Sequence, residues 1–376
     1  MYIMIISRGF PTNKYKMNGI FEFDQAKALA KAGSKVVFAA IDMRSIRRWR
    51  KWGMERHEID GVNVYVINIP GGRLPKAILY KITSIGLSIL YKVILKEVGK
   101  PDILHAHFTD LGYAAVKLKQ QINVPLVITE HSSLINKPVI EKQLLSIAKV
   151  AYEQADAVIA VSPALANGIR DKFNKKVLYV PNIVDTDLFT CAIRGEGETF
   201  NFVSIGNLNY GKRMDLTIES FYTAFHDLPL VTLTIFGEGE ERAKLEGIIK
   251  RHSLENRVVL MGMCSREVIT EKLKSTDCFV LASRSETFGV AYIEALASGV
   301  PVIATKCGGP EVFIHEKNGC MIPVDDFNAL VRAMVYIYKN NMIFDREKIS
   351  AEIKLKFSPD CVSKKLLEVY KDVIKF

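Results

Sequence analysis

Two glutamates eight positions apart, Glu286 and Glu294, lie in the part of this sequence best suited to bind a charged ligand. A polar loop containing Glu286 follows the apolar run Cys278–Leu281, and the pattern predicts a helix from about Gly289 to Ser298, ended by Gly299. The unpaired N–H groups at such a helix start favour the anionic oxygens of a diphosphate. A glutamate inside the helix can accept hydrogen bonds from ribose hydroxyls. Taken singly, each glutamate could also be an ordinary surface residue.

Two basic residues follow a second predicted strand. Lys212 and Arg213 lie after Phe200–Ile205, beyond Gly206 and Asn207. An enzyme that transfers a group from a diphosphate must stabilise the charge that develops on the leaving group. A fixed cation at a strand edge does this without a metal. The alternative is a solvated turn that happens to be basic.

Histidines occupy a third predicted strand, which includes His105 and His107. Strand alternation sends both side chains to one face. A histidine in an apolar strand is usually a packed residue, so the pattern alone does not assign a role. His131 and Ser132 follow the strand Leu126–Thr129, where a purely structural role and a place beside a substrate are equally compatible with the sequence.

Short β-rich runs alternate with helical patterns along the chain, which predicts parallel sheets covered by helices on both faces. The alternation restarts after Pro181-Asn182, and the polar stretch Thr190–Thr199 has the composition of a linker. We therefore expect two doubly wound domains. Ligands in such sheets bind outside the carboxyl ends of the strands, so an interdomain cleft is the expected site.

Composition indicates a folded, intracellular protein. Of 376 residues, 49% are hydrophobic and 24% charged, which excludes a disordered chain. The six cysteines include no CxxC spacing, as expected for free thiols in a reducing compartment. No basic segment precedes the first apolar run, so no signal peptide is predicted and a cytoplasmic location is expected. The apolar stretch Ala77–Val98 contains Lys81 and Lys92, and we interpret it as a helix and not a membrane span.

The excess positive charge lies in the N-terminal half of the chain. Residues 1–190 contain 27 Lys/Arg and 16 Asp/Glu, a balance of 27 − 16 = +11, against +10 for the whole chain. The segment Met43–Trp52 combines Arg47, Arg48, Arg50 and Lys51 with both tryptophans. This composition suits an anionic membrane surface, although an exposed basic loop without a partner is the alternative. No nucleic-acid recognition module accompanies the charge, so no nucleic-acid partner is expected.

The segment from Ser285 to Pro301 resembles the E-x7-E signature of the retaining GT-B glycosyltransferases, above all family 4. The resemblance extends over nearly the whole chain. Its other matching stretches are Pro181–Phe189, Phe236–Leu245, Val258–Gly262, Cys307–Glu311 and Asn318-Gly319.

The resemblance implies a role for each matching position. Glu286 would contact the donor sugar, Glu294 the ribose and Met263 the nucleotide base, while His107 would bind a sugar hydroxyl and not act as a base. Asn207 stands where the family has a basic residue, a departure that Arg213 would partly offset. His107, Glu286 and Lys212 are the implied catalytic residues, and His131 and Ser132 would line the acceptor side. The implied donor-binding set is Gly19, Asn207, Lys212, Arg213, Met263, Glu286, Thr287, Phe288, Gly289 and Glu294.

The resemblance also implies the architecture. Residues 1–185 with the terminal helix, 357–376, would form an acceptor-binding domain, and residues 186–356 a donor-binding domain. The expected reaction is metal-independent transfer of a hexose from a nucleoside-diphosphate sugar, with a UDP-sugar favoured over a GDP-sugar and no other cofactor. The expected acceptor is a glycan or a lipid-linked glycan of the cell envelope, met at the cytoplasmic face of a membrane. The alternatives are a catalytically silent sugar-nucleotide-binding subunit, and a sugar-nucleotide epimerase or a phosphorylase on a similar fold.

Two motifs are interpreted as coincidences. Asp185-Thr186-Asp187 has the form of a DxD metal-binding motif, but it lies in the interdomain stretch. Gly237–Arg242 matches only part of a GxGxxG pattern, so binding of NAD is not expected.

Overall fold

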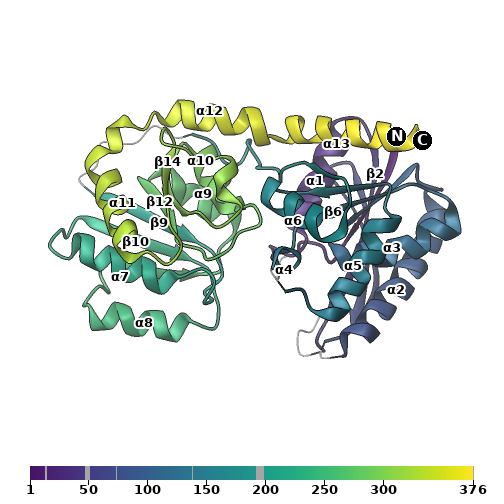
Figure 1. Ribbon diagram of the computed structural model, residues 1–376, viewed down its shortest axis with the longest axis horizontal. Coiled ribbons are helices and arrows are strands. Elements are labelled where there is room, and N and C mark those ends of the chain that lie inside the picture. Colours follow the sequence, from purple (N-terminus) through teal and green to yellow (C-terminus); the bar gives the residue numbers. More distant parts are fainter. Residues whose placement is uncertain (13–14, 47–50, 73, 138, 192–198, 376) are drawn as a thin grey trace. The chain divides into compact units, whose positions relative to one another are not determined.

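The computed structural model describes residues 1–12, 15–46, 51–72, 74–137, 139–191 and 199–375 (Figure 1). The chain divides into two compact units, Met1–Ile183 with Pro359–Phe376, and Val184–Ser358. These boundaries lie within two residues of the expected ones. Most of the basic cluster, Arg47, Arg48, Trp49 and Arg50, and the core of the expected linker, Arg194–Glu198, fall outside the described residues.

Unit 1 is built on an eight-stranded sheet with the order β3-β4-β2-β1-β5-β6-β7-β8. All pairs are parallel except that of β3 with β4. The sequence did not predict β3, because it is a mostly exposed edge strand without an apolar pattern. The strands are β1 (Tyr2–Ser7), β2 (Lys35–Arg44), β3 (Gly53–Ile59), β4 (Val62–Pro70), β5 (Ile103–His107), β6 (Leu126–Glu130), β7 (Ala157–Ala160) and β8 (Val177–Tyr179).

Helices cover both faces of this sheet. The helices are α1 (Ile20–Lys31), α2 (Lys76–Glu97), α3 (Thr109–Ile122), α4 (Ser133–Asn136), α5 (Lys142–Gln154), α6 (Pro163–Phe173) and α13 (Pro359–Ile374). The first and last of these pack together over a core that includes Phe38 and Leu366. On the other face α2 lies on β2 and β4 and beside α3, with Gly86 against Ile41 (Figure 1).

Among the described residues, α2 is the one helix long and apolar enough, by length and composition, to cross a membrane. A core helix of a soluble protein can pass the same test. One side of α2 packs on the sheet through Leu87, Leu90 and Ile94, which are buried. The helix predicted for Ala77–Val98 is confirmed.

Unit 2 contains a six-stranded, wholly parallel sheet with the order β11-β10-β9-β12-β13-β14. Its strands are β9 (Phe200–Ile205), β10 (Val231–Phe236), β11 (Val258–Gly262), β12 (Cys278–Leu281), β13 (Val302–Thr305) and β14 (Gly319–Ile322). Its helices are α7 (Met214–Phe225), α8 (Arg242–Arg251), α9 (Arg266–Lys274), α10 (Val290–Ala297), α11 (Phe327–Asn340) and α12 (Arg346–Phe357), with short 3₁₀ turns η1 (Pro310–Val312) and η2 (Asn341–Ile343).

Each sheet has one point at which the strand order reverses. In unit 2 the chain runs outward from β9 to β11 on one side and from β12 to β14 on the other, so the reversal lies between β9 and β12. In unit 1 it lies between β1 and β5. Loops that follow the two strands at such a point diverge and leave room for a ligand. The two doubly wound domains predicted from the sequence are therefore confirmed, and each has a defined place for a site.

Candidate functional site

In unit 2, an ion pair joins the two loops at the switch point. Lys212, from the loop after β9, places its Nζ 2.5 Å from Oε1 of Glu286, in the loop after β12. The Ser283 hydroxyl donates to the same carboxylate oxygen at 2.7 Å. Both charged side chains remain partly exposed, the lysine at 23% and the glutamate at 12%. The structure therefore brings together the cation and the carboxylate that the sequence placed 74 residues apart.

The helix predicted from about Gly289 to Ser298 is present as α10, and Gly289 is its N-cap. Gly289 has φ of 95°, a left-handed conformation that a residue with a side chain adopts at a cost. The free N–H groups of the first turn of α10 therefore lie next to the loop that holds Glu286 and Thr287. As predicted, the helix ends before Gly299.

Glu294 is buried within α10 and forms an ion pair with Arg266, at the start of α9, with 3.0 Å between Oε1 and an Nη atom. Both side chains are at most 10% exposed. This excludes the alternative in which Glu294 is a solvated surface residue. Arg266 was not predicted from the sequence, although it directly follows the loop after β11, where edge residues are expected.

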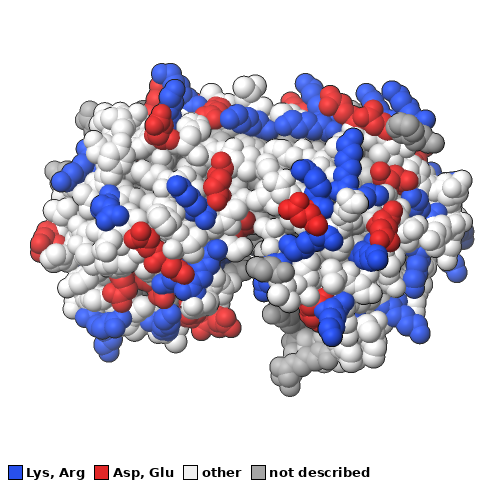
Figure 2. All heavy atoms as spheres, viewed as in Figure 1, with Lys and Arg blue, Asp and Glu red and all other residues white. Residues whose placement is uncertain are grey.

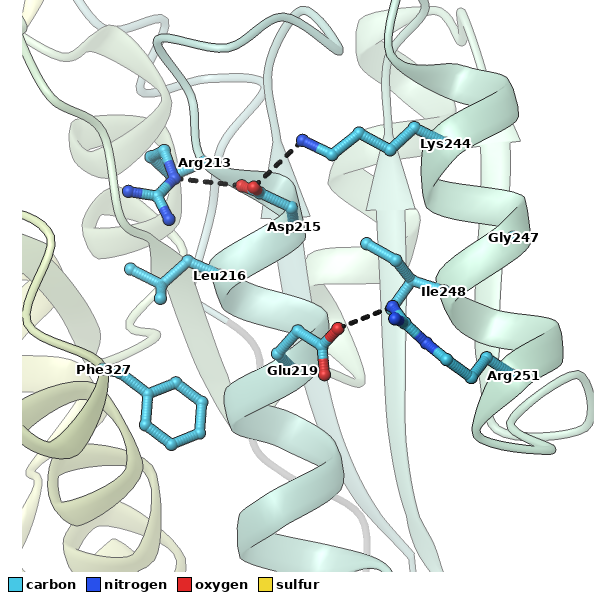
Figure 3. A pocket seen from close by; sticks show the side chains of 9 residues that line it. All are labelled: Arg213, Asp215, Leu216, Glu219, Lys244, Gly247, Ile248, Arg251 and Phe327. Carbon is cyan, nitrogen blue, oxygen red and sulfur yellow. Dashed lines mark hydrogen bonds and ion pairs between the residues drawn. The ribbon is translucent and has the colours of Figure 1, made fainter.

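Arg213 points to a different part of unit 2 from Lys212. Its guanidinium contacts Asp215, with 3.0 Å between Nε and Oδ1, and also Asp325. It lines a surface hollow of about 740 Å³ between α7 and α8, in which Lys244 also bonds to Asp215 (Figure 3). The positive charge of Arg213 is thus neutralised locally, away from the Lys212–Glu286 pair.

The remaining donor candidates occupy the same sheet edge in different environments. Asn207 and Met263 are exposed after β9 and β11. The ring of Phe288 is buried against Phe313 and Phe357, so a ligand can reach only its backbone.

In unit 1, the candidate edge is a cluster of three histidines, of which His105 and His107 are buried and His131 is partly exposed. The rings of His105 and His107 lie 4.4 Å apart, which confirms that they share a face of β5. His105 is saturated, because its Nε2 lies 2.7 Å from the Thr129 hydroxyl and its Nδ1 2.6 Å from the Tyr370 hydroxyl. His107 bonds through Nδ1 to Nε2 of His131 at 2.9 Å.

The structure distinguishes His107 from its neighbour. Its Nε2 atom is buried and has no hydrogen-bond partner among the described residues. Leaving a buried polar atom without a partner is costly in a folded protein. His107 thus has a ring nitrogen whose hydrogen-bonding capacity no described residue uses, whereas both ring nitrogens of His105 have partners.

All three rings are neutral near pH 7. Burial lowers the pKa of both His105 and His131 to about 3. Burial also lowers the pKa of His107 well below its ordinary value, and the two neighbouring histidines add to the effect. A neutral imidazole can donate or accept one hydrogen bond at Nε2, which fits a hydroxyl partner better than an anionic one.

Arg8, which also lies at this edge, was not predicted from the sequence as a site residue. Arg8 follows β1, forms a bidentate pair with Asp110 at 2.6 to 3.0 Å, and lies over the ring of Phe108. Phe108 has φ of 70° and ψ of 155°, a conformation that strains the backbone by about 1–3 kcal/mol and often marks a functional site. Glu130 is fully buried and accepts hydrogen bonds from Tyr152 and from the backbone, so it braces the loop.

Two of the weaker candidates have local structural roles. Ser132 caps α4 by accepting the backbone N–H of Leu134. Gly19 has φ of 71°, and a Cβ atom there would lie 2.1 Å from the carbonyl oxygen of Gly9. A side chain at position 19 would therefore displace the loop after β1. The backbone at Gly19 and the backbone at Gly9 therefore approach each other closely in this loop.

In the DxD-like stretch, the first aspartate has a local structural role. Asp185 uses its Oδ1 to accept the backbone N–H groups of Asp187 and Leu188, as a turn cap does. Within the described part of the chain, no group of three or more His, Cys, Asp or Glu side chains is arranged to hold a metal ion.

Two family models match the chain. The model described as "Glycosyl transferases group 1" matches residues 199–340, and that described as "Glycosyltransferase Family 4" matches residues 23–188. The first match lies in unit 2 and the second almost wholly in unit 1.

Curated proteins show the same relationship. The chain is 27% identical over 291 residues to N-acetyl-alpha-D-glucosaminyl L-malate synthase of Bacillus anthracis, covering 73% of this chain and 75% of that protein. It is 26% identical over 299 residues to a phosphatidylinositol N-acetylglucosaminyltransferase component of Arabidopsis thaliana, covering 77% and 65%.

Solved structures share the fold. Sucrose-phosphate synthase from Thermosynechococcus elongatus superposes with a TM-score of 0.82 at 20% identity, over 100% of this chain and 99% of that one. Anabaena HepE in complex with UDP superposes with a TM-score of 0.73 at 18% identity, over 99% of each chain.

Proposed function

Since this chain belongs to the family 4 type of glycosyltransferases and has the GT-B fold, we propose that it is a retaining hexosyltransferase. Its donor would be a nucleoside-diphosphate sugar, with UDP-sugars preferred. Its acceptor would be a glycan or a lipid-linked glycan at the cytoplasmic face of a membrane. The relatives' names support a nucleotide-sugar donor, because HepE is named in complex with UDP and with UDP-glucose.

One observation carries the proposal: the Lys212–Glu286 pair at the switch point of unit 2. The ammonium group of Lys212 is fixed at the edge where a diphosphate would meet the start of α10. It would neutralise the charge that develops as the bond between the sugar and the β-phosphate breaks. Glu286, held by Ser283, would accept hydrogen bonds from sugar hydroxyls.

The proposed step retains the configuration at the anomeric carbon. The acceptor oxygen forms its bond to that carbon on the face from which the diphosphate leaves. The acceptor's proton passes to the departing phosphate oxygen, so no protein carboxylate is needed as a nucleophile. His107 is neutral and would bind a substrate hydroxyl through Nε2, without taking a proton.

Glu294 would bind the ribose. In the structure, its carboxylate is oriented by the ion pair with Arg266. A fixed orientation suits a carboxylate that accepts hydrogen bonds from two adjacent ribose hydroxyls. A bound ribose would share this carboxylate with the arginine. The Arg266–Glu294 pair is buried in unit 2. A residue inside α10, such as Glu294, can reach this position, whereas Glu286 lies in the loop before the helix.

The acceptor is proposed from charge and from relatives. Residues 1–190 carry the balance of +11, and the Arabidopsis relative is named for phosphatidylinositol, a lipid. Both favour an acceptor presented at an anionic surface. The basic cluster that first suggested this, Arg47 to Lys51, lies mostly outside the described residues, so it contributes through its composition alone.

The test is turnover with a panel of UDP- and GDP-sugars and lipid-linked acceptors. The expected result is release of nucleoside diphosphate in step with glycoside formation, unchanged by EDTA, and abolished in Glu294→Ala. The anomeric proton coupling of the product, measured by NMR, should match that of the donor sugar. Inverted stereochemistry would exclude the proposed mechanism. Donor binding without turnover would instead identify a silent binding subunit.

A further inference from the structure

The outward side of α2 carries a single stripe of isoleucines and lysines. Ile78, Lys81, Ile85, Ile89, Lys92 and Lys96 follow one another at steps of three or four residues, so they lie on one face of the helix. All six are exposed, and the three isoleucines are 45%, 52% and 47% exposed. We call these six residues the α2 stripe.

Between Lys76 and Lys96, the charged residues of this helix are all lysines. No acidic residue occurs between Lys76 and Lys96. Among the described residues, neither Lys81 nor Lys92 has an ion-pair partner, in contrast to Lys76, which pairs with Glu141. The lower right of Figure 2, where Figure 1 draws α2, is mostly white and blue with few red spheres. A helix with exposed isoleucines and unpaired lysines presents the chemistry that an anionic lipid surface binds.

A groove adjoins the stripe near its N-terminal end. It has a volume of about 390 Å³ and lies between α2, α3 and α5. Its lining includes Tyr80, Lys81, Tyr113, Lys117 and Gln143, a set of hydrogen-bond donors and two ammonium groups. The groove is lined by residues near the N-terminal ends of α2 and α5, and by Tyr113 and Lys117 of α3, the helix that follows the strand carrying His107. A phosphate-bearing headgroup fits both the charge and the donors of the groove.

We propose that the α2 stripe docks unit 1 on an anionic bilayer, with α2 parallel to the surface and a lipid headgroup phosphate in the adjoining groove. The packed side of α2 is committed to the sheet through Leu87, Leu90 and Ile94, which leaves an interfacial and not a spanning orientation. The inference deepens the proposed function, because it gives the face by which the enzyme would meet a lipid-linked acceptor. It concerns binding alone and can fail or hold separately from transfer.

The test is flotation of the full chain with vesicles of phosphatidylcholine, and with an equal mixture of phosphatidylcholine and phosphatidylglycerol. The chain is expected to float with the mixed vesicles, more weakly as salt is raised, and not with phosphatidylcholine alone. Lys81→Gln with Lys117→Gln should weaken binding by about 20-fold, since each lysine near an anionic surface contributes about fivefold. Ile85→Ser with Ile89→Ser should weaken it by about tenfold.

The matched control is Lys172→Gln with Lys176→Gln, which removes the same charge from exposed lysines at the end of α6 and just before β8. It should bind as the unaltered chain does. Equal losses in control and test variants would overturn the proposal, as would full binding by the isoleucine variant. A dimer in light scattering that Ile85→Ser with Ile89→Ser converts to a monomer would also overturn it, since the stripe would then join two copies.

Two further measurements separate this proposal from the proposed function. The circular dichroism spectra and melting temperatures of the variants should match those of the unaltered chain, because all the altered side chains are on the surface. Calorimetric binding of UDP should also be unchanged. Loss of vesicle binding with retained UDP binding would support the docking surface. Vesicle binding by a chain that shows no transfer would leave docking in place and exclude the proposed function alone.

Discussion

The candidate side chains at the switch point of unit 2 are charged and paired, whereas the candidate histidines at that of unit 1 are neutral, and two of the three are buried. Lys212 and Glu286 form a partly exposed ion pair, while His105, His107 and His131 form a chain of uncharged rings. Charged pairs at an open edge can exchange partners with an anionic ligand at little desolvation cost. Buried neutral rings instead offer a fixed pattern of single hydrogen bonds. The same topology thus suits a diphosphate in one unit and hydroxyl groups in the other.

The largest expected effect is on the stability of unit 2. Glu294→Ala leaves the Arg266 guanidinium buried without its carboxylate, which should lower the free energy of unfolding by about 3–5 kcal/mol. Urea unfolding followed by circular dichroism measures this loss. Replacing both residues by Met should cost less than the single change. Glu246→Ala, which removes an exposed partner of Arg242, is the control and should cost at most about 1 kcal/mol. Equal losses for Glu294→Ala and Glu246→Ala would contradict a buried pair.

The next effect concerns catalysis at the Lys212–Glu286 pair of unit 2. Lys212→Ala should lower kcat by about 10²–10³-fold, equivalent to about 2.7–4 kcal/mol, because it removes the cation proposed to stabilise the leaving diphosphate. Steady-state kinetics with the preferred donor would measure it, and Lys212→Arg should recover part of the rate. Lys244→Ala removes a cation of the surface hollow whose partners are Asp215 and Glu241, and kcat should not change. An unaltered kcat in Lys212→Ala would reject the role of the pair.

The stability of unit 1 should depend on pH through its buried and partly buried histidines. His105 and His131 have pKa values of about 3 when folded, against about 6.5 when unfolded. The unfolded chain therefore binds more protons between these values, so the stability that the two residues contribute is complete above about pH 6.5 and falls as pH is lowered toward 3. Between these two pKa values, each histidine should lower the free energy of unfolding by about 1.4 kcal/mol for each unit by which the pH falls. Urea unfolding of unit 1 from about pH 7 to about pH 5 tests this, followed by fluorescence because both tryptophans, Trp49 and Trp52, lie in that part of the sequence.

A variant identifies the source of the pH effect. His131→Asn should reduce the slope of stability against pH by about 1.4 kcal/mol per unit. A slope identical to that of the unaltered chain would mean that His131 is not held neutral by burial.

The smallest effect concerns a single hydrogen bond within the neutral edge. Tyr370→Phe removes the hydroxyl that lies 2.6 Å from Nδ1 of His105 and leaves that buried nitrogen without a partner. The expected loss of stability is about 1–3 kcal/mol, measured by the same fluorescence. Tyr336→Phe, on the exposed face of α11, should change nothing. No difference between the two variants would show that the Tyr370 hydroxyl does not stabilise the cluster.

The sequence was sufficient for those parts of the site that depend on order along the chain. Strand alternation predicted both sheets, and the loops after β9 and β12 gave Lys212 and Glu286, because parallel strands end at a common edge. The shared face of His105 and His107 followed from strand periodicity alone.

Contacts between distant segments could not be predicted in this way. Arg266 could not be paired with Glu294 from the sequence, because their ion pair joins the start of α9 to a residue of α10, 28 positions further along the chain. Nothing in the sequence pattern pairs Arg8 with Asp110, because the two residues are 102 positions apart in the chain. The antiparallel β3 lacks buried alternation because it is an edge strand, so its pattern carries no signal.

The place of α13 in unit 1 has a consequence for how this protein is made. Tyr370 reaches His105 across 265 residues, and all of unit 2 lies between them in the chain. A ribosome therefore releases the whole of unit 2 before it supplies the helix that covers α1. During synthesis, unit 1 lacks α13 until the end of the chain has been made, so the surface of α1 that α13 covers stays exposed. All residues of unit 2 have been made by then, so unit 2 can fold first. The order of completion is thus the reverse of the order of translation.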